Sequence, residues 1–130
     1  DLDTYFPGLI ELNKNPSGTS DRIQILGRPS GIISFQIYKD NNPQAIISNL
    51  SGNMRTSVLK AALAYDKNDV AFTFSGNSTP YLDTAAEIPY TNYISIGEQN
   101  EGYMNGTIKK IAYYPERLSD SEIQALTENN

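Results

Sequence analysis

The sequence predicts an all-β domain in which short antiparallel strands form a sandwich or barrel, followed by a short C-terminal helix. Runs rich in β-branched and aromatic residues recur at nearly regular spacing, with turn residues between them. The clearest run, at residues 70–74, alternates Val70, Phe72 and Phe74 with smaller residues. A complete helix start lies at Ser119, after the last of these runs.

The N-terminal half contains several strand candidates. Residues 1–8 hold two aromatic residues before Pro7-Gly8, and they are expected to form a linking arm or an edge strand. Loops rich in Asn, Ser, Gly and Pro separate the segments that follow. Strands are expected at residues 9–12, 22–26, 32–38 and 44–48.

The middle of the chain is expected to continue the sandwich. Residues 58–65 suit either a strand or a helix, and the turn at residues 66–69 with a strong strand after it favours a strand. Residues 76–91 contain two prolines and predict a long irregular crossing. A further strand at residues 93–97 and a polar turn at residues 98–103 follow.

The last predicted strand spans residues 107–114. The dipeptide Asn105-Gly106 indicates a tight reversal before it, and Pro115 ends it because proline has no amide hydrogen for a sheet. Ile108 and Ile111 are three apart, which breaks the alternation of a strand. Either a β-bulge lies at residues 109–110 or both faces are buried, and we favour the bulge.

The C-terminal helix has a full set of start signals. Ser119 and Glu122 have the spacing of a capping box, in which each side chain bonds the backbone amide of the other. Leu118 and Ile123 occupy the two positions of a hydrophobic staple around that cap. Ile123 and Leu126 share one helix face, so we expect both to dock on the sheet.

Composition excludes several classes of function. The chain has 130 residues, the size of one domain, and we expect a single domain over residues 1–130. It has no Cys and no His, so thiolate chemistry and histidine general bases are absent. Its net charge of −5 argues against nucleic-acid binding, and no run is long enough for a membrane span. The numbering begins at Asp1 without a methionine. Either the chain is a processed product or a piece of a longer chain, or it has an ordinary start that is disordered, and neither alternative is favoured.

The C-terminal half also resembles a known family. The pattern from Asn105-Gly106 through two isoleucines to Tyr113-Tyr114, and then Arg117-Leu-Ser-Asp to Ile123 and Leu126, resembles the end of concanavalin A-like lectin/glucanase domains. The laminin G-like group is most similar, especially its copies in bacteriophage tail and fibre proteins. Residues 60–66, 70–76 and 93–97 are similar to further strands of that family. The resemblance covers residues 57–127 well and residues 1–56 weakly, and it implies a jelly roll of two antiparallel sheets.

We expect no catalysis. The glucanase branch of the family uses carboxylates at alternate positions of one strand, where they face each other across the sugar bond. The nearest match, Glu98 and Glu101, lies in a predicted turn with different spacing. A serine triad would need a base that this chain does not contain.

Calcium is the one cofactor that the sequence leaves open. Asp66, Asn68 and Asp69 form the densest group of oxygen-bearing side chains, and relatives in the family hold calcium at loops of the sheet edge. The alternative is a tight turn, which favours Asn and Asp because their side chains bond the local backbone. The turn is the favoured interpretation, because the spacing is not that of an EF-hand loop.

Exposed tyrosines are the leading candidates for ligand contacts. An aromatic ring can pack on the C–H face of a sugar while neighbouring polar groups bind its hydroxyls. Tyr81, Tyr90 and Tyr103 lie in predicted loops, and Asn100 and Glu101 are among the polar residues near them. The alternative is that these rings fill the ends of the sandwich. Three further tyrosines, Tyr65, Tyr113 and Tyr114, fall in predicted strands and are assigned to the core.

These observations predict a non-catalytic recognition module of a phage or other surface structural protein, on a virion or at an extracellular surface. Its expected partner is a glycan or a host-surface receptor, within an oligomeric assembly. The alternative is a purely structural assembly or decoration domain that binds other virion proteins. A laminin G-like, protein-binding domain of a secreted bacterial protein is a third possibility, because fold does not fix function.

Overall fold

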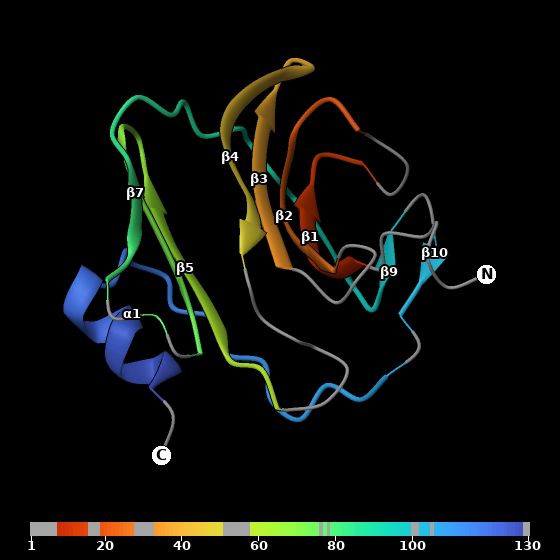
Figure 1. Cartoon of the computed structure of the whole chain (residues 1–130). Helices are drawn as coiled ribbons and strands as arrows, with labels where there is room; N and C mark the ends of the chain where they lie inside the picture. Colours follow the sequence, from red (N-terminus) through yellow and green to blue (C-terminus); the bar gives the residue numbers. More distant parts are fainter. Residues whose placement is uncertain are drawn as a thin grey trace.

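The computed structural model describes residues 8–15, 19–27, 33–50, 58–75, 77, 79–99, 102–104 and 106–128. Two antiparallel sheets face each other, and one helix packs on the outside of the smaller sheet (Figure 1). The strands are β1 (Gly8–Asn13), β2 (Arg22–Gly27), β3 (Ile33–Lys39), β4 (Asn42–Leu50), β5 (Ala61–Asp66), β6 (Asp69–Phe74), β7 (Tyr81–Asp83), β8 (Tyr93–Ile96), β9 (Glu98–Gln99) and β10 (Gly102–Tyr103). The helix is α1 (Asp120–Thr127). This architecture confirms the predicted antiparallel two-sheet sandwich with a short C-terminal helix.

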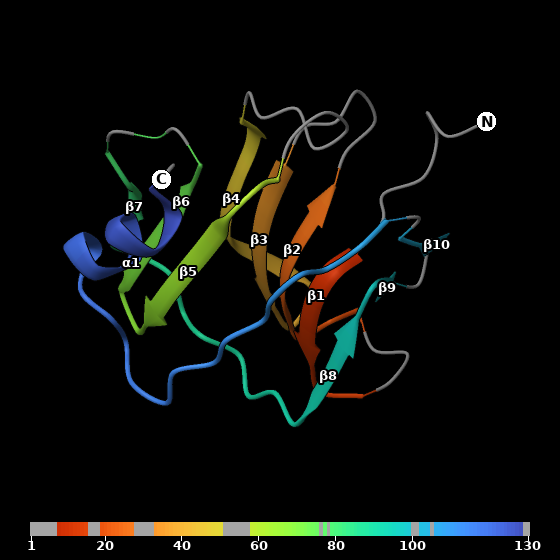
Figure 2. The ribbon, with the colours of Figure 1, turned by 90° about the horizontal axis from the view of Figure 1, so that it is seen from below.

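The larger sheet, called sheet A below, has the order β4-β3-β2-β1-β8. Its first four strands follow one another in sequence, and β8 returns from far along the chain to pair with the free edge of β1 (Figure 2). The smaller sheet, called sheet B, has the order β5-β6-β7. The short strands β9 and β10 form a separate hairpin beside β1. The strands of the described residues therefore form one large sheet, one small sheet and a short hairpin.

The core lies between the two sheets. Its centre is Phe72 of β6, which is fully buried and stacks on Phe35 of β3 with ring centroids 5.4 Å apart. Phe74 stacks beside Phe72 at 6.3 Å. The inward face predicted from Val70, Phe72 and Phe74 is therefore confirmed. Of residues 58–65, which suited either a strand or a helix, residues 61–65 belong to strand β5, and residues 58–60 precede it.

Helix α1 covers the other face of sheet B. Ile123 is 1% exposed and packs against Ala64 and Ala71, whose small side chains let the helix approach the strands closely. The predicted cap is present: Ser119 accepts a hydrogen bond from the Glu122 amide, and Glu122 accepts one from the Ser119 amide at 2.8 Å. Leu118 packs on the same cluster, as the staple predicts. Strand β6 is consequently covered on both sides.

Replacing Ser119 tests the contribution of this cap. We expect Ser119→Ala to lower the free energy of unfolding by about 1 kcal/mol, because an amide at the helix start loses its acceptor. A denaturation midpoint measured in urea is the check, with Thr107→Ala, which removes an exposed hydroxyl outside the helix, as the control. A midpoint equal to that of the parent protein would contradict a stabilising role for the cap.

Several elements differ from the sequence-based prediction; within the segment predicted as a polar turn at residues 98–103, β9 and β10 form a short antiparallel pair. Residues 107–114 form no strand, and Ile111 is 43% exposed, so neither a bulge nor burial on both faces occurs there. Residues 81–83, predicted as part of an irregular crossing, form β7 on the edge of sheet B. In the helix, Leu126 is 45% exposed and Thr127 is buried in its place. The predicted linking arm falls on residues 1–8, of which only Gly8 is described, and it belongs to β1.

Candidate functional site

The three tyrosines predicted as ligand contacts are all exposed. Tyr81 is 41% exposed in β7, Tyr90 is 73% exposed between β7 and β8, and Tyr103 is 78% exposed in β10. Two of them therefore belong to short strands and not to loops. Their exposure means that they do not fill the ends of the sandwich.

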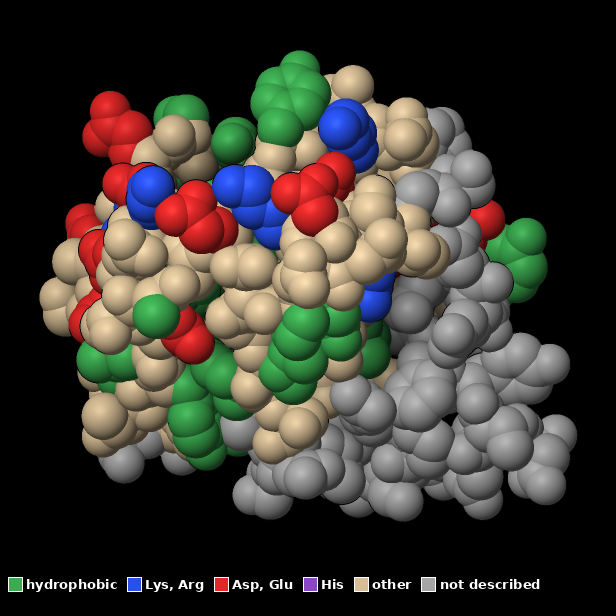
Figure 3. Space-filling view, turned by 90° about the horizontal axis from the view of Figure 1, so that it is seen from above, with side chains coloured by type: hydrophobic (Ala, Val, Ile, Leu, Met, Phe, Trp, Pro, Cys, Tyr) green, Lys and Arg blue, Asp and Glu red, His purple; other side chains and the backbone are tan. Residues whose placement is uncertain are grey.

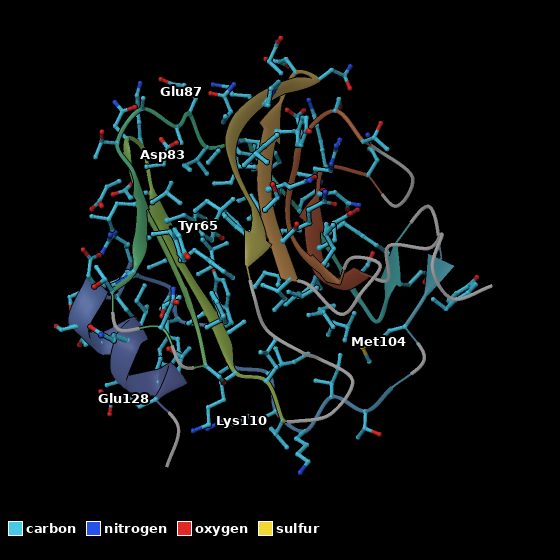
Figure 4. The ribbon with its side chains drawn as sticks, viewed as in Figure 1. Tyr65, Asp83, Glu87, Met104, Lys110 and Glu128 are labelled. Carbon is cyan, nitrogen blue, oxygen red and sulfur yellow. The ribbon has the colours of Figure 1, made fainter. Side chains whose placement is uncertain are left out.

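The structure does not gather these tyrosines into one site. Strand β7 is an edge strand of sheet B, and β10 lies on the opposite side of the molecule, beyond sheet A (Figures 1 and 2). Asp83, the last residue of β7, and Met104, which follows β10, are correspondingly far apart in Figure 4. Asn100 and Glu101 lie outside the described residues. One binding surface cannot use Tyr81 and Tyr103 together.

A different group of tyrosines does converge, in a shallow groove between β5 and the chain leading to α1. Its volume is about 120 Å³, and we call it the tyrosine groove. Tyr65 lies on its β5 side, with Tyr113 and Tyr114 on the other. The complete lining is Leu63, Ala64, Tyr65, Ala112, Tyr113, Tyr114, Pro115, Glu116, Arg117 and Leu118.

Exposure within the tyrosine groove differs from the sequence-based assignment. Tyr113 and Tyr114 were assigned to the core of a final strand, yet they are 71% and 44% exposed. Tyr65 and Tyr113 line the same groove; burial raises the pKa of Tyr65, and the charge interaction with Tyr113 raises it further. The signal that could have located the groove is Tyr-Tyr-Pro, because a proline after two aromatic residues interrupts a strand.

Arg117 fixes one wall of the groove. Its Nη2 atom lies 2.7 Å from a carboxylate oxygen of Asp69 and 2.7 Å from one of Asp120. Its Nη1 atom donates to the Leu118 carbonyl at 2.7 Å. Arg117 is largely buried, and its planar guanidinium serves several acceptors at once. The chain beside Tyr113 and Tyr114 is therefore attached both to the β5–β6 hairpin and to the start of α1.

The residues predicted to hold calcium form that β5–β6 hairpin. Asp66 and Asp69 pair across it, and Asn68 has a positive φ of 57°, a conformation that Asn tolerates. An Asp66 carboxylate oxygen accepts from the Lys67 amide at 2.7 Å, and Asp69 pairs with Arg117. Within the described residues, no three acidic side chains form a group that could hold a metal ion. The geometry is that of a tight turn with internal hydrogen bonds.

A second polar feature joins the two sheets at the end of the molecule that carries the β3–β4 and β5–β6 turns. Glu87 lies between them (Figure 4), 3.2 Å from Lys39 Nζ of sheet A and 2.9 Å from Lys67 Nζ in the β5–β6 turn. Hydrogen bonds from Lys67 and then Lys39 lower the pKa of Glu87. Acidic and basic side chains are interspersed across this end of the molecule (Figure 3). Such exposed pairs add little stability, and mixed charges give this end no single sign that would attract a charged ligand.

Comparison with known proteins gives little further information. No family model and no curated protein matches the chain. A solved structure of an S-layer domain-containing protein from Clostridium thermocellum (residues 221–444) is similar at 15% identity and a TM-score of 0.45. The match covers 98% of this chain, which spans 65% of that structure's chain. The resemblance of residues 57–127 to concanavalin A-like domains stays a prediction.

A row of buried polar side chains on the outer face of sheet A was not predicted from the sequence. Glu11, Gln24 and Gln36 pair across β1, β2 and β3, and each is at most 9% exposed. Burial raises the pKa of Glu11, although a hydrogen bond from Asn13 and the charge of Arg22 oppose that shift. Alternation marks these positions as facing away from the core, which in a sandwich usually means toward water. Their burial is the unexpected finding.

The described residues contain no helix with the length and apolar character needed to cross a membrane.

Proposed function

We propose that the chain is a non-catalytic recognition module that binds carbohydrate through the tyrosine groove. The observation that carries the proposal is the convergence of Tyr65, Tyr113 and Tyr114 from two separate segments on one hollow. Tyrosine offers a flat apolar face together with a polar hydroxyl, which suits the alternating C–H and O–H surfaces of a sugar ring. Glu116, at the edge of the same hollow, adds a carboxylate that can accept hydrogen bonds from sugar hydroxyls.

The groove is small and open, so one sugar residue is the largest unit it would enclose. A site of this kind buries little ligand surface, and its contacts are offset by lost motion and desolvation. The affinity of one site is therefore expected to lie at about millimolar to micromolar dissociation constants. Display of several copies in one assembly would raise the overall avidity without any new contact.

The resemblance to domains of phage tail and fibre proteins supports a location on a virion or an extracellular surface. In that setting a glycan or another host-surface receptor would be the partner. Rigid support suits such a role, because Arg117 attaches the groove wall to both the hairpin and the helix. A preorganised site loses less freedom on binding than a mobile one.

Glycan-array binding by a multimeric form of the domain tests this proposal. We expect Tyr113→Ala combined with Tyr114→Ala to reduce the signal at least about tenfold, which corresponds to a loss of about 1.4 kcal/mol, since the two rings supply flat apolar surface on one side of the groove. Tyr90→Ala is the matched control, because Tyr90 is 73% exposed and Tyr113 is 71% exposed. A melting curve for each variant checks that the fold is retained.

The pattern of losses separates the alternatives. Loss of binding in Tyr90→Ala or Tyr103→Ala, with the groove variant unaffected, would assign the site to the tyrosines first predicted from the sequence. Absence of glycan binding by every form would contradict the proposal. Self-association without glycan binding would favour an assembly domain, and exposed apolar side chains on strands at the sheet edges, such as Leu82 and Ile94, would then be the first contacts to examine.

A further inference from the structure

The charged side chains at the tyrosine groove include more carboxylates than cations. Glu116 belongs to the lining, and its side chain is exposed. Arg117, the other charged residue of the lining, lies 2.7 Å from a carboxylate oxygen of Asp69 and 2.7 Å from one of Asp120. The single guanidinium is therefore shared by two carboxylates, and Glu116 adds a third carboxylate beside them. This surface has an excess of negative charge.

Arg117 is not available to an anionic ligand, because each of its nitrogens already has an acceptor within the protein. Its Nε atom donates to the Asp69 carbonyl at 3.3 Å and its Nη1 atom to the Leu118 carbonyl at 2.7 Å. Its Nη2 atom contacts the two carboxylates, and the Arg117 side chain is only 15% exposed. A sugar with a carboxylate or sulfate group would have to break this largely buried ion pair to reach the guanidinium, which is costly.

The start of helix α1 is likewise already occupied by acidic side chains. The positive end of a helix dipole favours anions, so a helix start beside the groove could in principle attract an acidic sugar. Asp120 and Glu122, however, supply negative charge to the first turn, and the Glu122 amide donates to the Ser119 hydroxyl. The helix start therefore adds to the preference against acidic ligands.

The neighbouring lysines do not reverse this balance. Lys67 follows Tyr65 by two residues, and its Nζ atom pairs with Glu87 at 2.9 Å. Lys109 and Lys110 belong to the segment that precedes the lining residues, and Lys110 lies well away from Tyr65 (Figure 4). The surface of the tyrosine groove therefore stays acidic.

We propose that the tyrosine groove selects carbohydrates that carry a positively charged ammonium group, such as sugars with a free amine. This inference rests on the proposed function and names the class of glycan. A cation near the face of a tyrosine ring is attracted by the negative face of its π system. Tyr65, Tyr113 and Tyr114 supply the rings of the groove. The Glu116 carboxylate at the edge of the same groove can accept hydrogen bonds from the ammonium group.

The selectivity for charge should be moderate. Tyr113 and Tyr114 are 71% and 44% exposed, and cation–π contacts at exposed sites are weaker than those in desolvated ones. Carboxylates at a surface are also screened by salt. A free amine should therefore bind about three- to tenfold more tightly than the same sugar with its amine acetylated. The difference should shrink as the salt concentration rises.

Titration with two matched oligosaccharides, followed by NMR chemical shifts, tests the inference. The probes are a trimer of glucosamine and its fully N-acetylated form, at about pH 6, where an amine of ordinary pKa is protonated. The shift changes report both the dissociation constant and the place of binding. We expect the free-amine trimer to bind about three- to tenfold more tightly. The largest shift changes should fall on the lining, at residues 63–65 and 112–118.

Glu116→Gln removes one charge from the groove and keeps an oxygen that can accept hydrogen bonds. It should weaken binding of the free-amine trimer more than binding of the acetylated trimer, and so narrow the preference at least about twofold. Glu98→Gln is the matched control, because it removes the same charge from β9, on the far side of the molecule from sheet B (Figure 1). It should leave the preference unchanged. Equal narrowing in both variants would assign the preference to the net charge of the chain and would overturn the inference.

The remaining outcomes separate this inference from the proposed function. Binding of the acetylated trimer in the groove as tightly as the free-amine trimer, or more tightly, would overturn the ammonium preference and leave the carbohydrate site in place. A preference that persists when Tyr113→Ala and Tyr114→Ala are combined would place the selection outside the groove and would also overturn it. Binding of neither trimer in the groove would overturn the ammonium preference, whereas the glycan array decides whether carbohydrate binds at all.

Discussion

Phe72→Ala should lower the free energy of unfolding by about 3–5 kcal/mol, because removing a buried aromatic ring loses its burial and leaves a cavity. Phe72 is fully buried, at 0% exposed, and its ring stacks on that of Phe35 from the facing sheet. Such a loss is a large part of the 5–15 kcal/mol stability of an ordinary domain. Equilibrium unfolding in urea, followed by circular dichroism, measures it.

A conservative change at the same position is the control. Phe72→Leu keeps most of the apolar volume and should cost less than the alanine variant. Near-parent stability of Phe72→Ala would mean that the contact between the two sheets is not the main source of stability. An equal loss in both variants would instead point to the ring stacking itself.

Ile123→Ala should give the second largest loss, about 2–5 kcal/mol. Ile123 is 1% exposed, and it is the one large apolar side chain of α1 that is buried. A helix of eight residues is not stable by itself, so it depends on docking to sheet B. Loss of this contact should free the helix as well as destabilise the sandwich.

Leu126→Ala in the same helix is the matched control for Ile123→Ala. Leu126 is 45% exposed, so its truncation should cost much less than that of Ile123. Unfolding midpoints of the two variants and loss of helical circular dichroism are the measurements. Equal midpoints for the two variants would contradict the docking of α1 through Ile123.

Most strands could be predicted from the sequence because their two faces meet different surroundings. In β3, Phe35 and Ile37 face the core, and the positions between them face away, so alternation is visible. The helix start was equally readable, because a capping box depends on a few neighbouring residues. Such features are local, and local physics is enough to identify them.

The elements that were predicted wrongly depend on contacts with residues far along the chain. Residues 107–114 have the composition of a strand, yet they form no ladder, so their tyrosines line a groove and are not part of the core. The burial of Thr127 was not predicted, because it depends on a contact between its hydroxyl group and that of Thr73, 3.3 Å away on β6. Strand β7 is short and follows a proline, which made it look like a loop. In each case tertiary contacts override composition.

The candidate site was predicted less well than the fold for the same reason. Exposure of Tyr81, Tyr90 and Tyr103 was anticipated, but their wide separation follows from the sheet order. The polar row at Glu11 required knowledge of which strands pair, because its members come from β1, β2 and β3. Spacing along the chain carries no information about such cross-strand neighbours.

The pairing of β1 with β8 has a consequence for biosynthesis. Strands β1 to β4 can pair as they leave the ribosome, because each adjoins the next in sequence. The second edge of β1 has no partner until β8 has been made, which at ordinary elongation rates takes several seconds. During that interval the nascent sheet presents an open edge that includes Ile10 and Leu12. The growing chain would then be most vulnerable to misassociation, and most in need of a chaperone, before its second half exists.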